Sequence, residues 1–231
     1  MAAKAVRLMV VLHLGCPVSN TYVKYPRTPH LPWSPGSTPD DERLDRLSNF
    51  VGREIVVTEK LDGENTSLYS DHVHARSLDS GHHPSRSWVK ALQGRVGPLL
   101  PSGWRLCGEN CFATHSIAYD NLDSYFILFS VWNESNQCLD WEQTVEWAAL
   151  LEVALAPVLY RGPWNERLLR RLPEQLDLSR QEGFVVRTAA GFAYSDFGQH
   201  MAKWVRSHHV TTDAHWMTRA VVANRLRGEP C

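Results

Sequence analysis

Residues 55–67, which read IVVTEKLDGENTS, constrain the fold more than any other part of this chain. Residues 55–57 are a β-branched run, which predicts a short strand entering the core. The strand ends at Lys60, and Asp62-Gly63 then turns the chain. A lysine in that place projects into a cleft, where desolvation and neighbouring cations are expected to lower the pKa of its amine and free it as a nucleophile. The alternative is a surface lysine ahead of a hairpin turn.

Four later segments place charged or aromatic side chains on predicted strands. Residues 104–107 form a short strand leading to Gly108-Glu109, and residues 124–132 (SYFILFSVW) form the most apolar stretch, a buried strand. Two further strands carry EGFVVR at residues 182–187 and MAKWVR at residues 201–206. Charged groups at the ends of such strands are typical of a site in a cleft between sheets.

The string Lys60-Leu61-Asp62-Gly63 resembles motif I of the covalent nucleotidyltransferases, the superfamily of polynucleotide ligases and RNA-capping guanylyltransferases. The later segments resemble that superfamily's later motifs, in the same order. The similarity is closest to the ATP-dependent RNA ligases, either the second RNA ligase family or a minimal bacterial relative. Asn65 supports this, because it follows motif I where that family uses an asparagine in sealing.

The resemblance implies a role for each matching residue. Lys60 is the catalytic nucleophile, Lys203 presents a cation to the α-phosphate of ATP, and Glu182 holds the catalytic Mg²⁺ or Mn²⁺. The nucleotide-binding set that it implies is Glu59, Asp62, Gly63, Asn65, Arg76, Glu109, Phe129, Lys203 and Arg206.

Several of these roles have alternatives. Phe129 is the expected purine-stacking residue, but Ser130 stands where the family has an aspartate, so Phe126 remains the alternative. Glu109 matches the family's ribose-binding carboxylate, against the alternative of an exposed turn residue. Val205 replaces the second lysine of motif V, which leaves Arg206 as the next cation. Asp62 is expected to fix the turn around the nucleophile.

The implied reaction has three steps. Lys60 attacks ATP to form a lysyl–AMP, the AMP passes to the 5′-phosphate of an RNA end, and a 3′-hydroxyl then expels it. We expect an RNA ligase acting in RNA repair, with RNA and a repair protein as partners. The alternatives are a GTP-using guanylyltransferase of the capping type and a non-catalytic nucleotide- or RNA-binding relic of the fold. A preference for GTP or ATP distinguishes the guanylyltransferase from the ligase. An intact Lys60 argues against the non-catalytic relic.

The implied fold class is α+β: an ATP-grasp-like nucleotidyltransferase domain of two packed antiparallel sheets, flanked by helices and without an OB-fold domain. We expect one domain over residues 1–231, a monomer, with a proline-rich arm at residues 25–39. The net charge of −1 provides no overall positive field, so RNA binding requires a local basic patch. Five scattered cysteines and the lack of a membrane-length apolar run predict a cytoplasmic protein.

The remaining pattern predicts scaffold elements. The arm either contacts phosphate through Arg27 or is a plain connector, and residues 4–16 are either a first strand or an over-extended start before Met9. Strands are expected at residues 66–70 and 72–76, and helices at residues 40–50, 85–96, 141–155, 165–172 and 213–227.

Overall fold

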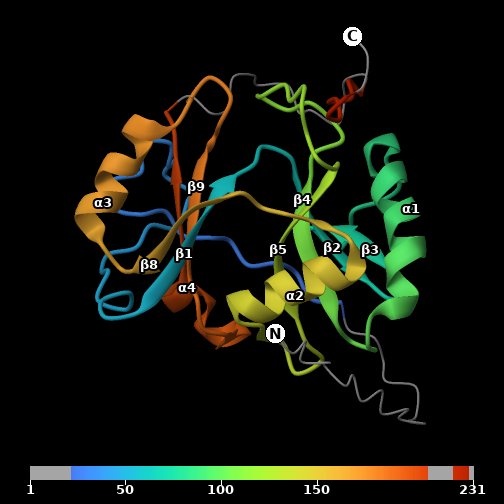
Figure 1. The fold of residues 1–231 in the computed structure, drawn as a ribbon, viewed down its shortest axis with the longest axis horizontal. Coiled ribbons are helices and arrows are strands. Elements are labelled where there is room, and N and C mark those ends of the chain that lie inside the picture. Colours follow the sequence, from blue (N-terminus) through green and yellow to red (C-terminus); the bar gives the residue numbers. More distant parts are fainter. Residues whose placement is uncertain (1–21, 208–220, 229–231) are drawn as a thin grey trace, which may run out of the picture.

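The computed structural model describes residues 22–207 and 221–228. Two sheets face each other, and the longer helices lie outside them, as Figure 1 shows. Both sheets are antiparallel except for one short parallel pair, β5 with β7. The expected α+β architecture of two packed sheets with flanking helices is therefore confirmed.

The first sheet has four strands in the order β11-β9-β1-β8. Their bounds are β1 (Glu54–Lys60), β8 (Val158–Pro163), β9 (Gly183–Thr188) and β11 (Met201–Val205). The strand β1 is distant in sequence from β9 and β11, which follow each other with 12 residues between them. These three strands carry the segments around Lys60, EGFVVR and MAKWVR.

The second sheet has seven strands in the order β10-β6-β5-β4-β2-β3, with β7 paired to β5. Their bounds are β2 (Glu64–Tyr69), β3 (Val73–Ala75), β4 (Arg105–Asn110), β5 (Phe126–Trp132), β6 (Gln137–Cys138), β7 (Ala154–Leu155) and β10 (Phe192–Ala193). The turn after β1 leads directly into β2, so the predicted Asp62-Gly63 turn connects the two sheets.

The helices lie on both outer faces (Figure 1). They are α1 (Ser87–Val96), α2 (Trp141–Leu151), α3 (Glu166–Arg171) and α4 (Phe197–His200), with 3-10 turns η1 (Pro84–Arg86), η2 (Gly97–Leu99), η3 (Leu172–Gln175) and η4 (Tyr194–Asp196). The α2 helix begins with a capping box, in which Asp140 and Gln143 bond reciprocally.

Separate apolar cores lie on the two outer faces. One packs α1 and α2 against the second sheet and includes Val89, Leu128 and Leu151. Another packs α3 and part of the arm against the first sheet and includes Leu169 and Phe184. A third cluster, with Tyr25 and Trp132, joins the sheets.

Three predicted helices are wrong, wholly or in part. Residues 40–50 form turns, because the backbone between Glu42 and Leu44 bonds to His30 of the arm instead of to itself. The helix predicted to reach residue 155 ends at Leu151, since Glu152 turns the chain into the left-handed region and β7 follows. Within residues 213–227, the described part from residue 221 bonds to the segment at 112–122 and is not helical.

The proline-rich arm is an ordered part of the first sheet's edge. The Leu31 amide donates to the carbonyl of Lys203 at 2.8 Å, and the Lys203 amide donates to the carbonyl of Pro29 at 2.9 Å. The arm therefore lies beside β11 at the position of the motif V lysine. The predicted first strand at residues 4–16 lies outside the described residues.

Candidate active site

Lys60 and Glu182 form an ion pair at one end of the first sheet. Lys60 is the last residue of β1, and its register partner on β9 is Gly183, which places Glu182 beside it. The Lys60 ammonium donates a hydrogen bond to Glu182 Oε2, and the Glu182 side chain is only 6% exposed. Two segments more than 120 residues apart therefore meet through strand pairing, the first carrying the predicted nucleophile and the second the predicted metal ligand.

Gly183 is required for this register. Its φ is +156°, and a Cβ there would collide with the carbonyl oxygen of Trp204 on β11. The glycine thus lets β9 approach β11 closely while the chain brings Glu182 to Lys60.

The surroundings of Lys60 are acidic, contrary to the expectation of neighbouring cations. Burial acts to lower the pKa of Lys60, but the negative charge of nearby carboxyl groups, that of Glu182 above all, acts against it and raises the pKa above its usual value. The amine is therefore protonated in this state, and the expected lowering of its pKa is wrong. A free amine requires that the Glu182 carboxylate be neutralised or engaged elsewhere.

Glu109 reaches the same place from the second sheet. It lies on β4, and its Oε1 accepts a hydrogen bond from the amide of Gly63 at 3.2 Å. Burial raises the pKa of Glu109 to about 8, with the negative charge of Glu182 adding to the effect and Lys60 opposing it. The carboxyl thus carries a proton over much of the neutral range.

Lys203 on β11 faces the cleft from the other side of β9. Burial and the positive charge of Lys60 lower the pKa of Lys203, and the negative charge of Asp41, just after the arm, opposes this lowering. Lys203 and Asp41 form an ion pair, with 3.8 Å between Lys203 Nζ and Asp41 Oδ1. Thr38 fixes Asp41 by two hydrogen bonds of 3.0 Å, from its amide and its hydroxyl.

Asp62 stabilises the turn after Lys60. One of its carboxylate oxygens accepts three hydrogen bonds of 2.7 to 2.8 Å, from the amide and hydroxyl of Ser116 and the amide of Ile117. Its own amide donates to the Tyr119 hydroxyl at 2.9 Å. Asp62 thus ties the turn to the loop that follows β4.

A buried asparagine near the C-terminus supports that loop in turn. The Asn224 side chain, 3% exposed, donates to the carbonyl of Cys111 and accepts from the amide of Tyr119, both at 2.8 Å. It also accepts from the Thr114 hydroxyl at 2.9 Å. A chain of contacts therefore runs from Asn224 through this loop to Asp62, in the turn that follows Lys60.

The two candidate stacking residues lie on opposite faces of β5. Phe126 is fully buried in the cluster beneath α1 and α2, away from the first sheet. Phe129 is partly buried and packs with Tyr25, at a ring-centroid distance of 5.3 Å, in the cluster between the sheets. This geometry favours Phe129 for stacking on a base in the cleft.

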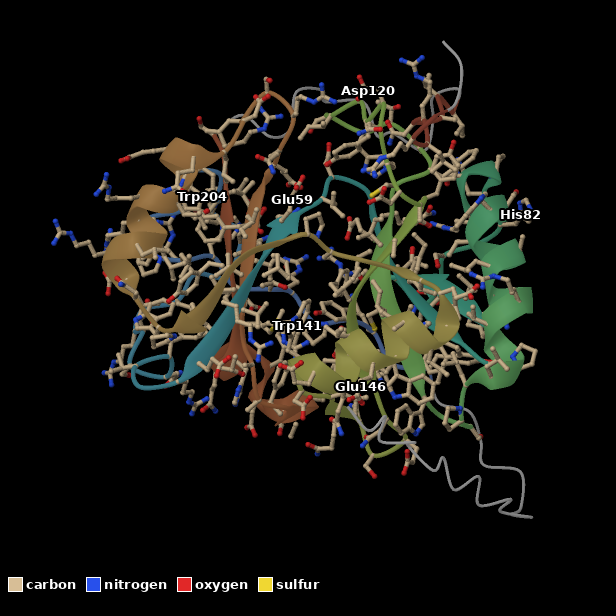
Figure 2. All side chains as sticks on the ribbon, in the orientation of Figure 1. Glu59, His82, Asp120, Trp141, Glu146 and Trp204 are labelled. Carbon is tan, nitrogen blue, oxygen red and sulfur yellow. The ribbon has the colours of Figure 1, made fainter. Side chains whose placement is uncertain are left out.

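Glu59 and Arg206 lie close to the ion pair. Figure 2 shows Glu59 at the end of β1, in the region between the two sheets. Its carboxylate accepts from Gln181 Nε2 at 2.9 Å. The Arg206 amide donates to the carbonyl of Glu182 at 3.0 Å, and the Arg206 Nε is buried without a hydrogen-bond partner among the described residues.

A pocket of about 570 Å³ lies beside the turn, on the second sheet. Gly63, Asn65, Arg76 and Glu109 of the predicted set line it, together with Lys24 and other residues. Asn65 Oδ1 is buried without a partner among the described residues, so its acceptor is available to a ligand. The structure thus brings the predicted residues together from both sheets.

Several neighbours could not be identified from the sequence. Asp41, Gln181, Ser116, Tyr119 and Asn224 hold predicted residues in place, but they lie in turns and loops with no motif of their own. A buried ion pair between Arg86 and Glu64 also fixes the start of β2.

The residues fit a divalent cation whose coordination is completed by substrate phosphates. No group of three or more His, Cys, Asp or Glu side chains suited to a metal ion occurs within residues 22–207 and 221–228. Mg²⁺ bound with phosphates needs only one or two carboxylates and keeps several waters. Glu182, a buried carboxylate whose present partner is the Lys60 ammonium, meets that need.

No helix among the described residues has the length and apolar character needed to cross a membrane.

Comparison with known proteins agrees with this geometry. The family model described as RNA ligase matches residues 53–205, and no curated protein matches the sequence. A solved archaeal ATP-dependent RNA ligase is similar in fold, with a TM-score of 0.54, 15% identity, and coverage of 79% of this chain and 48% of its own. A Naegleria gruberi RNA ligase with PPi gives a TM-score of 0.48 and 22% identity, covering 68% of this chain and 50% of its own.

The chain spans about half the length of these solved structures. The archaeal match supports the ligase-type nucleotidyltransferase fold, and the family match extends from β1 to β11, across every strand that carries the site. The chain therefore belongs to the RNA ligase family.

Proposed function

We propose that this protein is an ATP-dependent RNA ligase that joins 5′-phosphate and 3′-hydroxyl ends through a covalent lysyl–AMP on Lys60. One observation carries the proposal. Lys60, Glu182, Glu109 and Lys203 converge from β1, the start of β9, β4 and β11, so that a nucleophile, two carboxyls and a second cation share one place.

Each side chain has a part in the first step. The Lys60 amine, once deprotonated, forms a bond to the α-phosphorus of ATP, and the bond from that phosphorus to the bridging oxygen breaks to release pyrophosphate. Lys203 is placed to stabilise negative charge on the phosphate oxygens. Glu109, which holds a proton at neutral pH, can donate as well as accept hydrogen bonds toward the ribose.

Glu182 would hold the divalent cation, Mg²⁺ or Mn²⁺, which when bound neutralises phosphate charge. Glu182 would then interact with the cation as well as with the Lys60 ammonium. A Glu182 carboxylate shared with the cation would oppose the effect of burial less, so the pKa of the Lys60 amine would fall. Without the cation, the ion pair with Glu182 keeps Lys60 protonated.

The later steps use the same site. AMP passes from Lys60 to the 5′-phosphate of an RNA end, and the 3′-hydroxyl then forms the phosphodiester bond and expels AMP. Asn65 and Arg76 line the pocket next to the turn, where a second substrate would approach. We propose RNA repair as the setting for this reaction.

The test is transfer of label from nucleotide to protein. The purified protein, first stripped of bound AMP with pyrophosphate, is incubated with α-labelled ATP or GTP and Mg²⁺ and run on a denaturing gel. Acid-labile label from ATP supports the ligase. Label from GTP alone would instead indicate a guanylyltransferase, and no label from either would indicate a non-catalytic protein.

A further inference from the structure

An aromatic cluster lies at the edge of the second sheet, on the same face as the candidate active site. Its members are Tyr22, which precedes the arm, Tyr69 of β2, His72 just before β3, and His74 of β3. The Tyr22 ring stacks on that of His72 with centroids 4.1 Å apart and planes 20° apart. Tyr22 and His72 are partly exposed, whereas Tyr69 and His74 are buried behind them.

Strand pairing places this cluster in line with the site. His74 is the register partner of Ser67, so residues 72, 74 and 76 alternate onto the face that carries Asn65. His72 and Arg76 flank β3, and at the usual rise of a strand they are about 13 Å apart. The aromatic cluster thus lies next to the pocket, because His74 is followed in the chain by Ala75 and Arg76, which line it.

The cluster is rigid and has cations next to it. The hydroxyl of Tyr69 accepts from the amide of Val23 at 2.8 Å, and the hydroxyl of Tyr22 donates to Asp71 at 3.3 Å, which fixes the Tyr22 ring. Lys24 follows two residues after Tyr22 and reaches the pocket together with Arg76. His74 Nε2 is buried without a partner among the described residues.

We propose that Tyr22 and His72 form a stacking platform for an unpaired base of the RNA substrate, with Lys24 and Arg76 binding the adjoining phosphates. This inference rests on the proposed function and adds where the RNA strand enters the site. Single-stranded nucleic acid is bound by aromatic rings along a cationic groove, because every base has a stackable face while the phosphates need positive charge. With a net charge of −1, the chain needs such a local site.

The experiment separates base stacking from any general effect on the protein. Binding of two labelled probes is measured by fluorescence anisotropy: a 5′-phosphorylated single-stranded RNA, and a strand of equal length in which all bases are missing. Tyr22→Leu removes the ring and keeps apolar bulk, whereas Tyr22→Phe keeps the ring and removes only the bond to Asp71. Tyr160→Leu is the matched control, because Tyr160 is a partly exposed tyrosine of β8 in the other sheet.

We expect Tyr22→Leu to weaken binding of the intact RNA about tenfold, the usual effect of losing one stacked base. Binding of the baseless strand should not change, and Tyr22→Phe and Tyr160→Leu should bind both probes as the unaltered protein does. Equal losses for both probes, or no loss for either, would overturn the platform. Labelling of Lys60 by ATP, measured in parallel, tests the proposed function separately, because that step needs no RNA.

Discussion

At the scale of single residues, the site is a balance of charges around one amine. Lys60 is surrounded by the carboxyls of Glu182, Glu109 and Asp62, and each is held in a different way. Glu182 pairs with the amine, Asp62 is bound by backbone amides, and Glu109 is protonated over much of the neutral range because it is buried near the other two. The site therefore avoids holding three ionised carboxylates beside the Lys60 amine.

The first prediction concerns Glu109. Its pKa is about 8 in the folded protein, against a usual value of 4.5, so between these values the folded state keeps a proton that the unfolded chain has lost. The free energy of unfolding must then fall as pH rises through this window. Glu109→Gln, which does not titrate and keeps an acceptor for the Gly63 amide, should lack this part of the fall.

The measurement is urea unfolding of both proteins from about pH 5 to about pH 9. The stability of the variant relative to the unaltered protein should increase with pH up to about 8 and become constant above it. A constant difference would mean that Glu109 is ionised throughout.

At the scale of elements, strand register assembles the site and loops hold it. The pairing of β1 with β9 aligns Lys60 with Gly183, and the pairing of β9 with β11 aligns Gly183 with Val205. The turn after Lys60 is tied to the loop at 111–122, which the segment at 221–228 covers. The register of β1, β9 and β11 can therefore be tested separately from the packing of residues 221–228 on the loop at 111–122.

Register should depend on Gly183. The variant Gly183→Ala places a Cβ against the carbonyl of Trp204, so β9 and β11 must separate. We expect a loss of more than about 2 kcal/mol in the free energy of unfolding, together with loss of Lys60 labelling. Gly198→Ala is the control, because a Cβ there meets nothing within 4 Å and the residue is helical. Equal stability of the two variants would contradict the close approach of these strands.

The packing of residues 221–228 on the loop at 111–122 should depend on Asn224. In Asn224→Ala, the carbonyl of Cys111 and the amide of Tyr119 lose their buried partner, which should cost about 2–3 kcal/mol. Lys60 labelling should slow as well, because the loop that binds Asp62 loosens. Val222→Ala on the same segment is the control, since Val222 is 64% exposed. If Asn224→Ala is fully folded and its Lys60 is labelled at the unaltered rate, the loop does not position Asp62.

At the scale of the whole molecule, two sheets each supply half of the site. Lys60, Glu182 and Lys203 belong to the first sheet, and Glu109 and Asn65 to the second. The turn at 61–63 and the third apolar cluster join the halves. A nucleotide bound between them should therefore stabilise the fold as one unit.

Thermal unfolding tests this expectation. At a nucleotide concentration about a hundred times its dissociation constant, ATP should stabilise the folded state by about 2.7 kcal/mol. Lys203→Ala should reduce the stabilisation at the same ATP concentration, because the phosphates lose a cation. An ATP effect confined to a separate, partial unfolding transition would contradict a site shared by both sheets.

Much of this arrangement could be predicted from the sequence, because β-branched and apolar runs mark the strands and the family motifs lie at their ends. The helix predicted at residues 40–50 was wrong because the arm provides backbone partners that local periodicity does not reveal. The predicted lowering of the Lys60 pKa was wrong for a related reason. The carboxyl groups that raise it come from parts of the chain distant in sequence. Asp41 and Asn224 could not be predicted, since long-range contacts alone give them a role.

The central claim is that Lys60 receives AMP. The most direct test is to incubate the protein with ATP and Mg²⁺, digest it under conditions that preserve the phosphoramidate, and locate the AMP by mass spectrometry. The account predicts AMP on the peptide that contains Lys60, and no modified peptide from a folded Lys60→Ala protein. AMP on another residue, or an adenylated Lys60→Ala protein, would contradict it.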